Sequence, residues 1–120
     1  MKLLFKAEEA ASLALALLAI SLQSVSVAWW MWPFLFLSPD ISMLGYLHSS
    51  RTGAWTYNLF HHKGVAIGVI IAGYLLQMPW LLLAGLVLFA HSAFDRLLGF
   101  GLKYEDNFKH THLGYSDNRK

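Results

Sequence analysis

The chain alternates between long apolar stretches and short clusters of charged residues. Two stretches, residues 10–39 and 64–94, carry no Asp, Glu, Lys or Arg. A transmembrane helix needs only about 20 apolar residues to cross the hydrocarbon core of a bilayer. Each stretch is too long for one straight span, so the pattern predicts that each is divided by a turn.

Polar residues and a proline mark where the turns fall. Gln23, Ser24 and Ser26 interrupt the first stretch, and Gln77-Met78-Pro79 interrupts the second. Pro39 predicts a kink or break within the second helix. The prediction is an all-α polytopic membrane protein, a bundle of four transmembrane helices. It forms one domain over residues 1–120, with helices over about 7–25, 29–48, 53–77 and 79–99 and a polar tail over 103–120.

Composition supports a membrane protein and excludes several classes of function. Hydrophobic residues make up 57% of the chain and charged residues 13%, with a mean hydropathy of +0.47, which is too apolar for a small soluble domain. The absence of cysteine excludes disulfides, thiolate metal sites and a cysteine nucleophile. The net charge of +2 comes without a basic cluster, so we expect membrane lipid and not nucleic acid as a partner.

The distribution of Lys and Arg predicts the orientation. Both ends of the chain are basic and Arg51 lies between the second and third predicted helices, whereas the other two turns carry neither Lys nor Arg. The positive-inside rule therefore predicts a multi-pass protein of the bacterial inner membrane with both termini in the cytoplasm. The alternative is a cleaved signal peptide ending near residue 28, but Glu8 and Glu9 precede the apolar run. Glycines on the predicted spans offer faces for close helix packing or for a homo-oligomer.

Polar residues within the predicted spans gather at the cytoplasmic side. Such residues are costly in a membrane, so each is a functional hypothesis. His91 and Asp95 are four residues apart and share a helix face, while Asn58 can share a face with His61 or with His62. The set comprises Asp40, Asn58, His61, His62, His91 and Asp95, followed by His110 and His112 in the tail.

Imidazole and carboxylate groups are the usual ligands of zinc and of non-haem iron. We expect Asp40, His61, His91 and Asp95 to bind a divalent metal, zinc before iron, with His110 or His112 completing the site. Asn58 is predicted to orient a ligand or the substrate. One of the acids, Asp40 or Asp95, is the candidate general base.

Each of these residues also has a simpler explanation. Asp40 can cap a broken helix, and one of His61 and His62 can face lipid headgroups. Asp95 can pair with Arg51 or Arg96 at the membrane edge, and the tail histidines can be solvated. The metal hypothesis rests on the joint pattern, because all of the simpler explanations would have to hold together.

Four runs in the chain resemble a family of small bacterial integral membrane proteins of unknown function. They are Pro39-Asp40-Ile41-Ser42-Met43-Leu44-Gly45-Tyr46, Tyr57-Asn58-Leu59-Phe60-His61, residues 91–104, and Phe108-Lys109-His110-Thr111-His112-Leu113-Gly114. The resemblance implies a four-helix membrane protein and marks His61, not His62, as the shared histidine. More distantly, the chain is similar to bacterial inner-membrane proteins described as metal-dependent hydrolases, which implies a metal by analogy.

Two functions follow as hypotheses. The first is a membrane-embedded metal-dependent hydrolase that acts on a lipid or another amphiphile at the cytoplasmic leaflet, with a non-haem iron oxidase using the same ligands as its variant. The second is a non-enzymatic module, such as a small transporter, a proton relay or an assembly partner, in which the polar cluster locks helices together or moves protons.

Overall fold

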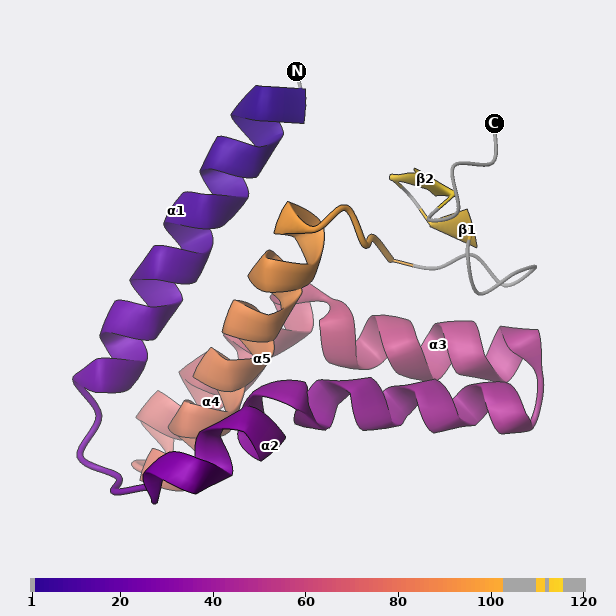
Figure 1. Cartoon of the computed structure of the whole chain (residues 1–120). Helices are drawn as coiled ribbons and strands as arrows, with labels where there is room; N and C mark the ends of the chain where they lie inside the picture. Colours follow the sequence, from indigo (N-terminus) through magenta and orange to yellow (C-terminus); the bar gives the residue numbers. More distant parts are fainter. Residues whose placement is uncertain (1, 103–109, 112, 116–120) are drawn as a thin grey trace.

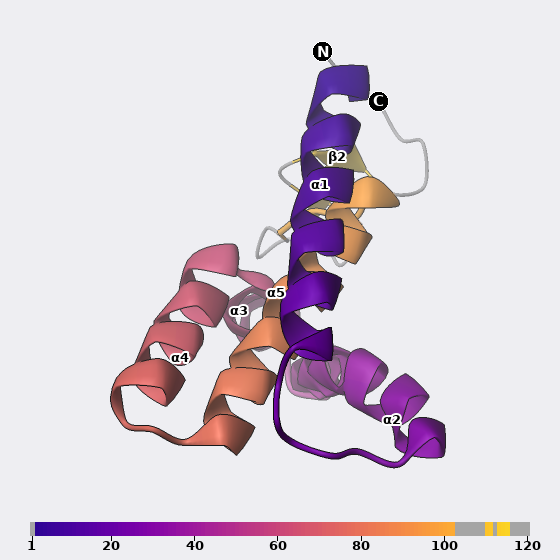
Figure 2. The same ribbon diagram turned by 90° about the vertical axis from the view of Figure 1, so that its left-hand side faces the viewer.

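The computed structural model describes residues 2–102, 110–111 and 113–115, and this part of the chain is predominantly helical. Three helices run roughly alongside one another, and a pair of shorter segments projects sideways from them (Figures 1 and 2). In order, the elements are α1 (Lys2–Ser21), η1 (Trp29–Met31), α2 (Trp32–Leu37), η2 (Ser38–Leu47), α3 (Ser50–His61), α4 (Lys63–Leu75), α5 (Pro79–Leu97), β1 (His110–Thr111) and β2 (Gly114–Tyr115).

The central element is α5, which packs against both α1 and α4. Pro79 begins α5 at a position where a missing backbone N–H costs nothing. Gly99, with φ +93°, ends it, and the Phe100 N–H donates to the Asp95 carbonyl over 2.8 Å. The predicted turn at Gln77-Met78-Pro79 joins α4 to α5. The two helices approach closely, since a Cβ on Gly73 would lie 2.4 Å from the Leu82 nitrogen.

The helix predicted over 53–77 is two helices in the structure. The backbone of His62 is extended, with φ −87° and ψ 122°, so α3 ends before it and α4 begins after it. The His62 Nδ1 accepts hydrogen bonds from the backbone N–H groups of Gly64 and Val65 and thereby caps α4. The hydropathy pattern did not show this break because a histidine cap depends on local geometry.

The other predicted helix boundaries shift as well. The predicted helix over 7–25 is α1, which begins and ends about four residues earlier. The predicted helix over 29–48 is divided into η1, α2 and η2, and η2 is a ten-residue 3₁₀ helix. The predicted break near Pro39 thus takes the form of a change from α to 3₁₀ geometry between Leu37 and Ser38. The predicted tail over 103–120 lies mostly outside the described residues.

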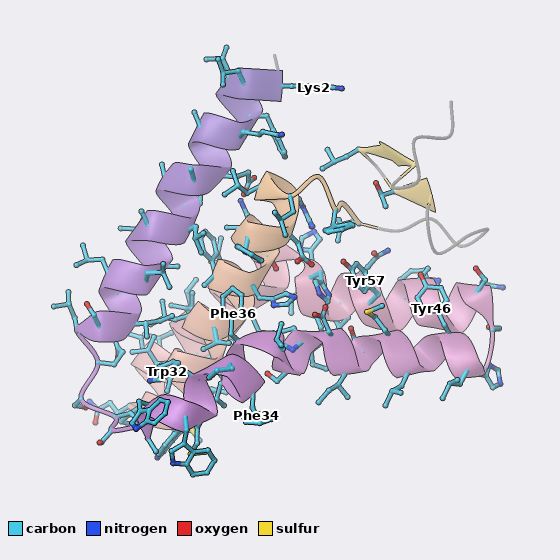
Figure 3. The ribbon with its side chains drawn as sticks, viewed as in Figure 1. Lys2, Trp32, Phe34, Phe36, Tyr46 and Tyr57 are labelled. Carbon is cyan, nitrogen blue, oxygen red and sulfur yellow. The ribbon has the colours of Figure 1, made fainter. Side chains whose placement is uncertain are left out.

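Within the described residues, one helix, α5, is long and apolar enough to cross a membrane. Buried core helices of soluble proteins have the same length and composition, so this finding by itself leaves the four-span bundle and the inner-membrane location as predictions. Large apolar side chains also cover the outside of the molecule. Phe34, for example, points away from the helices and is 73% exposed, whereas Phe36 points toward α5 (Figure 3).

Candidate metal centre

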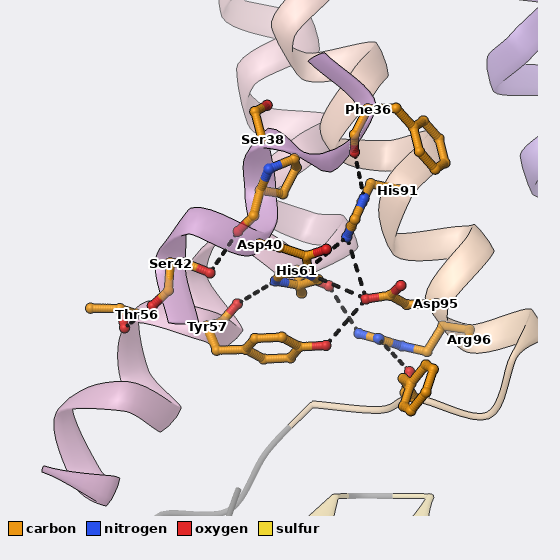
Figure 4. A network of polar contacts seen from close by, with 12 residues as sticks. Phe36, Ser38, Asp40, Ser42, Thr56, Tyr57, His61, His91, Asp95 and Arg96 are labelled. Carbon is orange, nitrogen blue, oxygen red and sulfur yellow. Dashed lines mark hydrogen bonds and ion pairs between the residues drawn. The ribbon is translucent and has the colours of Figure 1, made fainter. Parts of the chain in front are cut away.

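Four side chains from three elements meet where η2, α3 and α5 come together (Figure 4). They are Asp40 from η2, His61 from the end of α3, and His91 and Asp95 from α5. One ligand atom from each lies within 4.8 Å of the other three. The chain therefore contains a His₂Asp₂ cluster capable of holding a metal ion.

Each carboxylate oxygen of the cluster faces both imidazoles. Asp40 Oδ1 lies 3.1 Å from the Nε2 atoms of both His61 and His91. Asp95 Oδ2 lies 3.4 Å from His61 Nε2 and 3.5 Å from His91 Nε2. A tetrahedral zinc with ligands at about 2.0–2.1 Å places neighbouring ligand atoms about 3.3 Å apart. These four distances are close to that spacing, and the other two pairs of ligand atoms lie within 4.8 Å. The four atoms are therefore close enough together to hold a single ion.

Backbone carbonyls determine which nitrogen of each histidine carries a hydrogen. His61 Nδ1 donates to the Tyr57 carbonyl over 2.8 Å, and His91 Nδ1 donates to the Phe36 carbonyl over 2.6 Å. A carbonyl oxygen only accepts hydrogen bonds, so both Nδ1 atoms are protonated and a neutral ring presents a bare lone pair at Nε2. Two such lone pairs facing two carboxylate oxygens require a cation or additional protons between them.

Three of the four side chains in the cluster are buried, and the fourth is partly exposed. The side chains of His61 and His91 are 0% and 2% exposed, and that of Asp95 is 11% exposed. The Asp40 side chain is 39% exposed. Solvent or a substrate thus has its access to the centre beside Asp40.

A further set of contacts supports the ligands. The Tyr57 hydroxyl donates to Asp95 Oδ2 over 3.2 Å, and its ring stacks on His61 with centroids 3.8 Å apart. Arg96, which is buried, donates to the His61 carbonyl over 2.9 Å. Partners of this kind orient metal ligands and hold their geometry. The sequence offered a signal for Tyr57, because its position four residues before His61 places both side chains on one face of a helix.

The remaining predicted site residues lie elsewhere or outside the described part of the chain. His62 is exposed and caps α4, so it is His61 that joins the cluster. Asn58 is half-buried on α3, and its predicted role as an orienting residue stays a prediction. The His110 side chain and all of His112 lie outside the described residues, so their predicted role as ligands is untested.

Two basic residues near the cluster, Arg96 and Lys63, have partners other than the four ligands. Arg96 directs its guanidinium to the carbonyls of His61 and Phe100, while Asp95 faces the two histidines. Lys63 forms a salt bridge with the buried Glu9 of α1 and lies over the Phe89 ring, 5.4 Å from its centroid. The charged residues near the cluster therefore tie helices together.

A comparison with models of protein families shows to which family the chain belongs. Residues 2–115 match DUF4260, a domain of unknown function. The chain belongs to the DUF4260 family. A search of curated proteins and a search of solved structures each found no match. The DUF4260 assignment agrees with the resemblance to a family without an assigned reaction.

Proposed function

We propose that this DUF4260 protein is a membrane-embedded metalloprotein that binds one divalent cation, zinc before iron, through Asp40, His61, His91 and Asp95. The observation that carries the proposal is the meeting of two Nε2 lone pairs and two carboxylate oxygens at 3.1–3.5 Å, with each Nδ1 hydrogen committed to a backbone carbonyl. A divalent ion neutralises this arrangement and supplies the common partner for all four atoms.

The reaction we propose is hydrolysis of a carboxylic or phosphoric ester in a lipid or another amphiphile. A divalent ion at this position supplies Lewis acidity, which polarises the ester and acidifies water. In the reaction Asp40 acts as the general base instead of as a ligand: it accepts the proton of the attacking water and passes it to the departing alkoxide, so that acid and alcohol are the products. Asp40 suits this role because it is the exposed carboxylate of the cluster. His61, His91 and Asp95 hold the ion from the buried side.

The exposed surface supports a membrane location. Large apolar side chains on the outside of the helices are what a bilayer, and not water, accommodates. They include Leu15, Leu18, Phe34, Ile67, Ile71 and Leu76. The turn before η1 and the turn between α4 and α5 lie at the same end of the molecule, and neither carries a charge (Figures 1 and 2).

Labelling of introduced cysteines tests the membrane topology, because the natural chain has none. We expect Ser24→Cys and Gln77→Cys in intact cells to react with a membrane-impermeant maleimide. His48→Cys, at an exposed position on the predicted cytoplasmic side, should react only after the cells are opened. Release of the protein from membranes by alkaline carbonate, or equal labelling at all three positions, would contradict the membrane-embedded arrangement.

A second function is supported by the same distances. Two doubly protonated histidines beside two carboxylates would form hydrogen-bonded ion pairs at 3.1 Å. The cluster would then join η2, α3 and α5 without metal, as a structural lock or proton relay in a non-enzymatic membrane module. In this second function, neither the stability of the protein nor the protonation of the cluster depends on a metal ion.

Elemental mass spectrometry of protein purified in mild detergent without a histidine tag decides between the two functions. We expect about one equivalent of zinc or iron in the natural chain and none in His91→Ala. His62→Asn is the matched control, since it removes a histidine outside the cluster and keeps a side chain that caps helices. If His91→Ala does not fold, chelator titration of the natural chain, followed by circular dichroism, replaces it.

The metal proposal is overturned if well-folded natural protein binds neither zinc nor iron after reconstitution. The hydrolase proposal has its own test. The metal-loaded protein is incubated with vesicles that contain ester lipids, and the products are identified by mass spectrometry. Metal binding without release of acid or alcohol from glycerolipids, lysolipids or synthetic alkyl esters would retain the metal centre and reject hydrolysis.

A further inference from the structure

An apolar groove of about 670 Å³ lies along α5, between η2 and the end of α3. Its walls include Leu44 from η2, Phe60 from α3, and Trp80, Ala84 and Leu88 from α5. This volume is in the range of pockets that bind small ligands. Neither the metal proposal nor the family assignment uses this groove.

None of the four proposed ligands lines the groove, but residues next to two of them do. Pro39 and Ile41, which flank Asp40 in the chain, line it, and so does Phe60, which precedes His61. Leu88 precedes His91 by three residues, about one turn of α5. The groove therefore lies beside the backbone that carries Asp40 and His61.

The chemistry of the walls favours an apolar occupant. None of the described residues that line the groove is charged. Three carry hydroxyls, and each hydroxyl already donates to a backbone carbonyl at 2.7 Å: Ser38 to Leu35, Ser42 to Pro39, and Thr56 to Ser42. Figure 4 shows Ser38, Ser42 and Thr56 on the same side of the ligand cluster. The groove offers a hydrocarbon chain a continuous apolar surface and offers a polar ligand few donors.

We propose that the groove binds one hydrocarbon chain of a lipid or single-chain amphiphile and presents its ester to the metal centre beside Asp40. The wall formed by α5 extends from Trp80 to Leu88, which at the rise of an α-helix is about 12 Å. This inference rests on the proposed function, because it assigns the substrate class of the same centre. It makes the substrate an ester with a long alkyl chain on one side of the bond.

A photoreactive fatty acid tests the assignment. The metal-loaded protein in detergent is labelled with a diazirine-bearing hexadecanoic acid, and the labelled peptides are mapped by mass spectrometry. We expect saturable labelling of η2 and of the first half of α5, with loss of labelling when unlabelled hexadecanoic acid is in excess. Labelling of other exposed apolar faces should not saturate.

A variant that fills the groove makes the test specific. Ala84→Trp places a large side chain in the groove without touching a proposed ligand, and we expect it to abolish the saturable labelling. The matched control is Gly68→Trp on the exposed face of α4, where an added Cβ meets no atom within 4 Å. The control should label as the natural chain does, and both variants should bind metal.

The outcomes distinguish a failure of the groove assignment from a failure of the proposed metal centre. Normal metal binding with labelling that does not saturate, or that Ala84→Trp leaves unchanged, would overturn the groove assignment alone. Cross-links between two chains through the groove would assign it to a second copy and overturn the proposal as well. Saturable labelling in a protein that binds no metal would instead remove the proposed function, and with it the role of the groove as a substrate site.

Discussion

The two halves of the metal centre are built differently. His91 and Asp95 lie one turn apart on α5, a regular helix that is buried along this stretch and ended by Gly99. Asp40 lies on η2, a ten-residue 3₁₀ helix, and its side chain is 39% exposed. Runs of 3₁₀ helix this long are uncommon because their hydrogen-bond geometry is poorer than that of an α-helix.

The difference assigns different roles to two carboxylates of the same type. Asp95 accepts a hydrogen bond from Tyr57, faces both imidazoles and has a side chain that is only 11% exposed. Asp40 faces the same imidazoles, but its side chain is 39% exposed, and its neighbours Pro39 and Ile41 line the apolar groove. We expect α5 to supply the permanent ligands and η2 to supply the group that meets the substrate. Four sets of variants test this division.

The largest effect is expected for Asp95→Ala. It leaves the buried histidines without their carboxylate and the Tyr57 hydroxyl without its acceptor, so we expect the free energy of unfolding to fall by about 3–5 kcal/mol. Metal should also be lost. Chemical denaturation in detergent measures the change, and Glu8→Ala, which removes an exposed carboxylate from α1, should change it by less than about 0.5 kcal/mol. An equally small effect of Asp95→Ala would show that α5 is not the permanent half.

Asp40→Asn should separate folding from activity. The asparagine keeps the shape of the side chain and a neutral oxygen, so the protein should fold with a smaller loss of stability than Asp95→Ala causes. It cannot accept a proton, so hydrolysis of an ester lipid should fall by about 10²–10⁴-fold. Product formation and metal content measured on the same sample check this. If Asp40→Asn lowered the free energy of unfolding as much as Asp95→Ala does, the two halves of the metal centre would not have the different roles proposed for them.

A smaller effect is expected for Tyr57→Phe. This change removes the hydrogen bond to Asp95 Oδ2 and leaves the ring stacked on His61. Loss of such a supporting contact weakens metal binding by about 10–100-fold. Competition with a chelator of known affinity measures the change. Tyr74→Phe, on the exposed face of α4, is the control. If it decreased metal affinity by the same factor, Tyr57 would have no specific role in supporting the metal centre.

The smallest effects are expected at two glycines. Gly99 has a positive φ, so Gly99→Ala should destabilise the end of α5 by about 1–2 kcal/mol. Gly68 lies inside α4 with open space around it, so Gly68→Ala should stabilise the protein by up to about 1 kcal/mol. Thermal unfolding of the two variants should therefore shift in opposite directions. A shift in the same direction would show that the end of α5 does not require this backbone conformation.

The pattern of residues by itself predicted much of the candidate site. Asp40, His61, His91 and Asp95 stood out because ionisable groups are costly in apolar segments. The i, i+4 spacing of His91 and Asp95 placed them on one face of a helix, and the structure has both on α5. The turn at Gln77-Met78-Pro79 was also predicted from the sequence, and the proline there begins α5.

Other features were decided by contacts between distant residues, which hydropathy does not record. The break at His62 depends on an imidazole that caps the next helix, and the helix predicted over 53–77 ignored it. The 3₁₀ geometry of η2 and the pairing of Glu9 with Lys63 likewise depend on packing between elements. The positions of Tyr57 and Arg96 around the ligands follow from how α3 crosses α5. Periodicity determines which residues share a face of one helix, whereas only tertiary packing determines which faces meet.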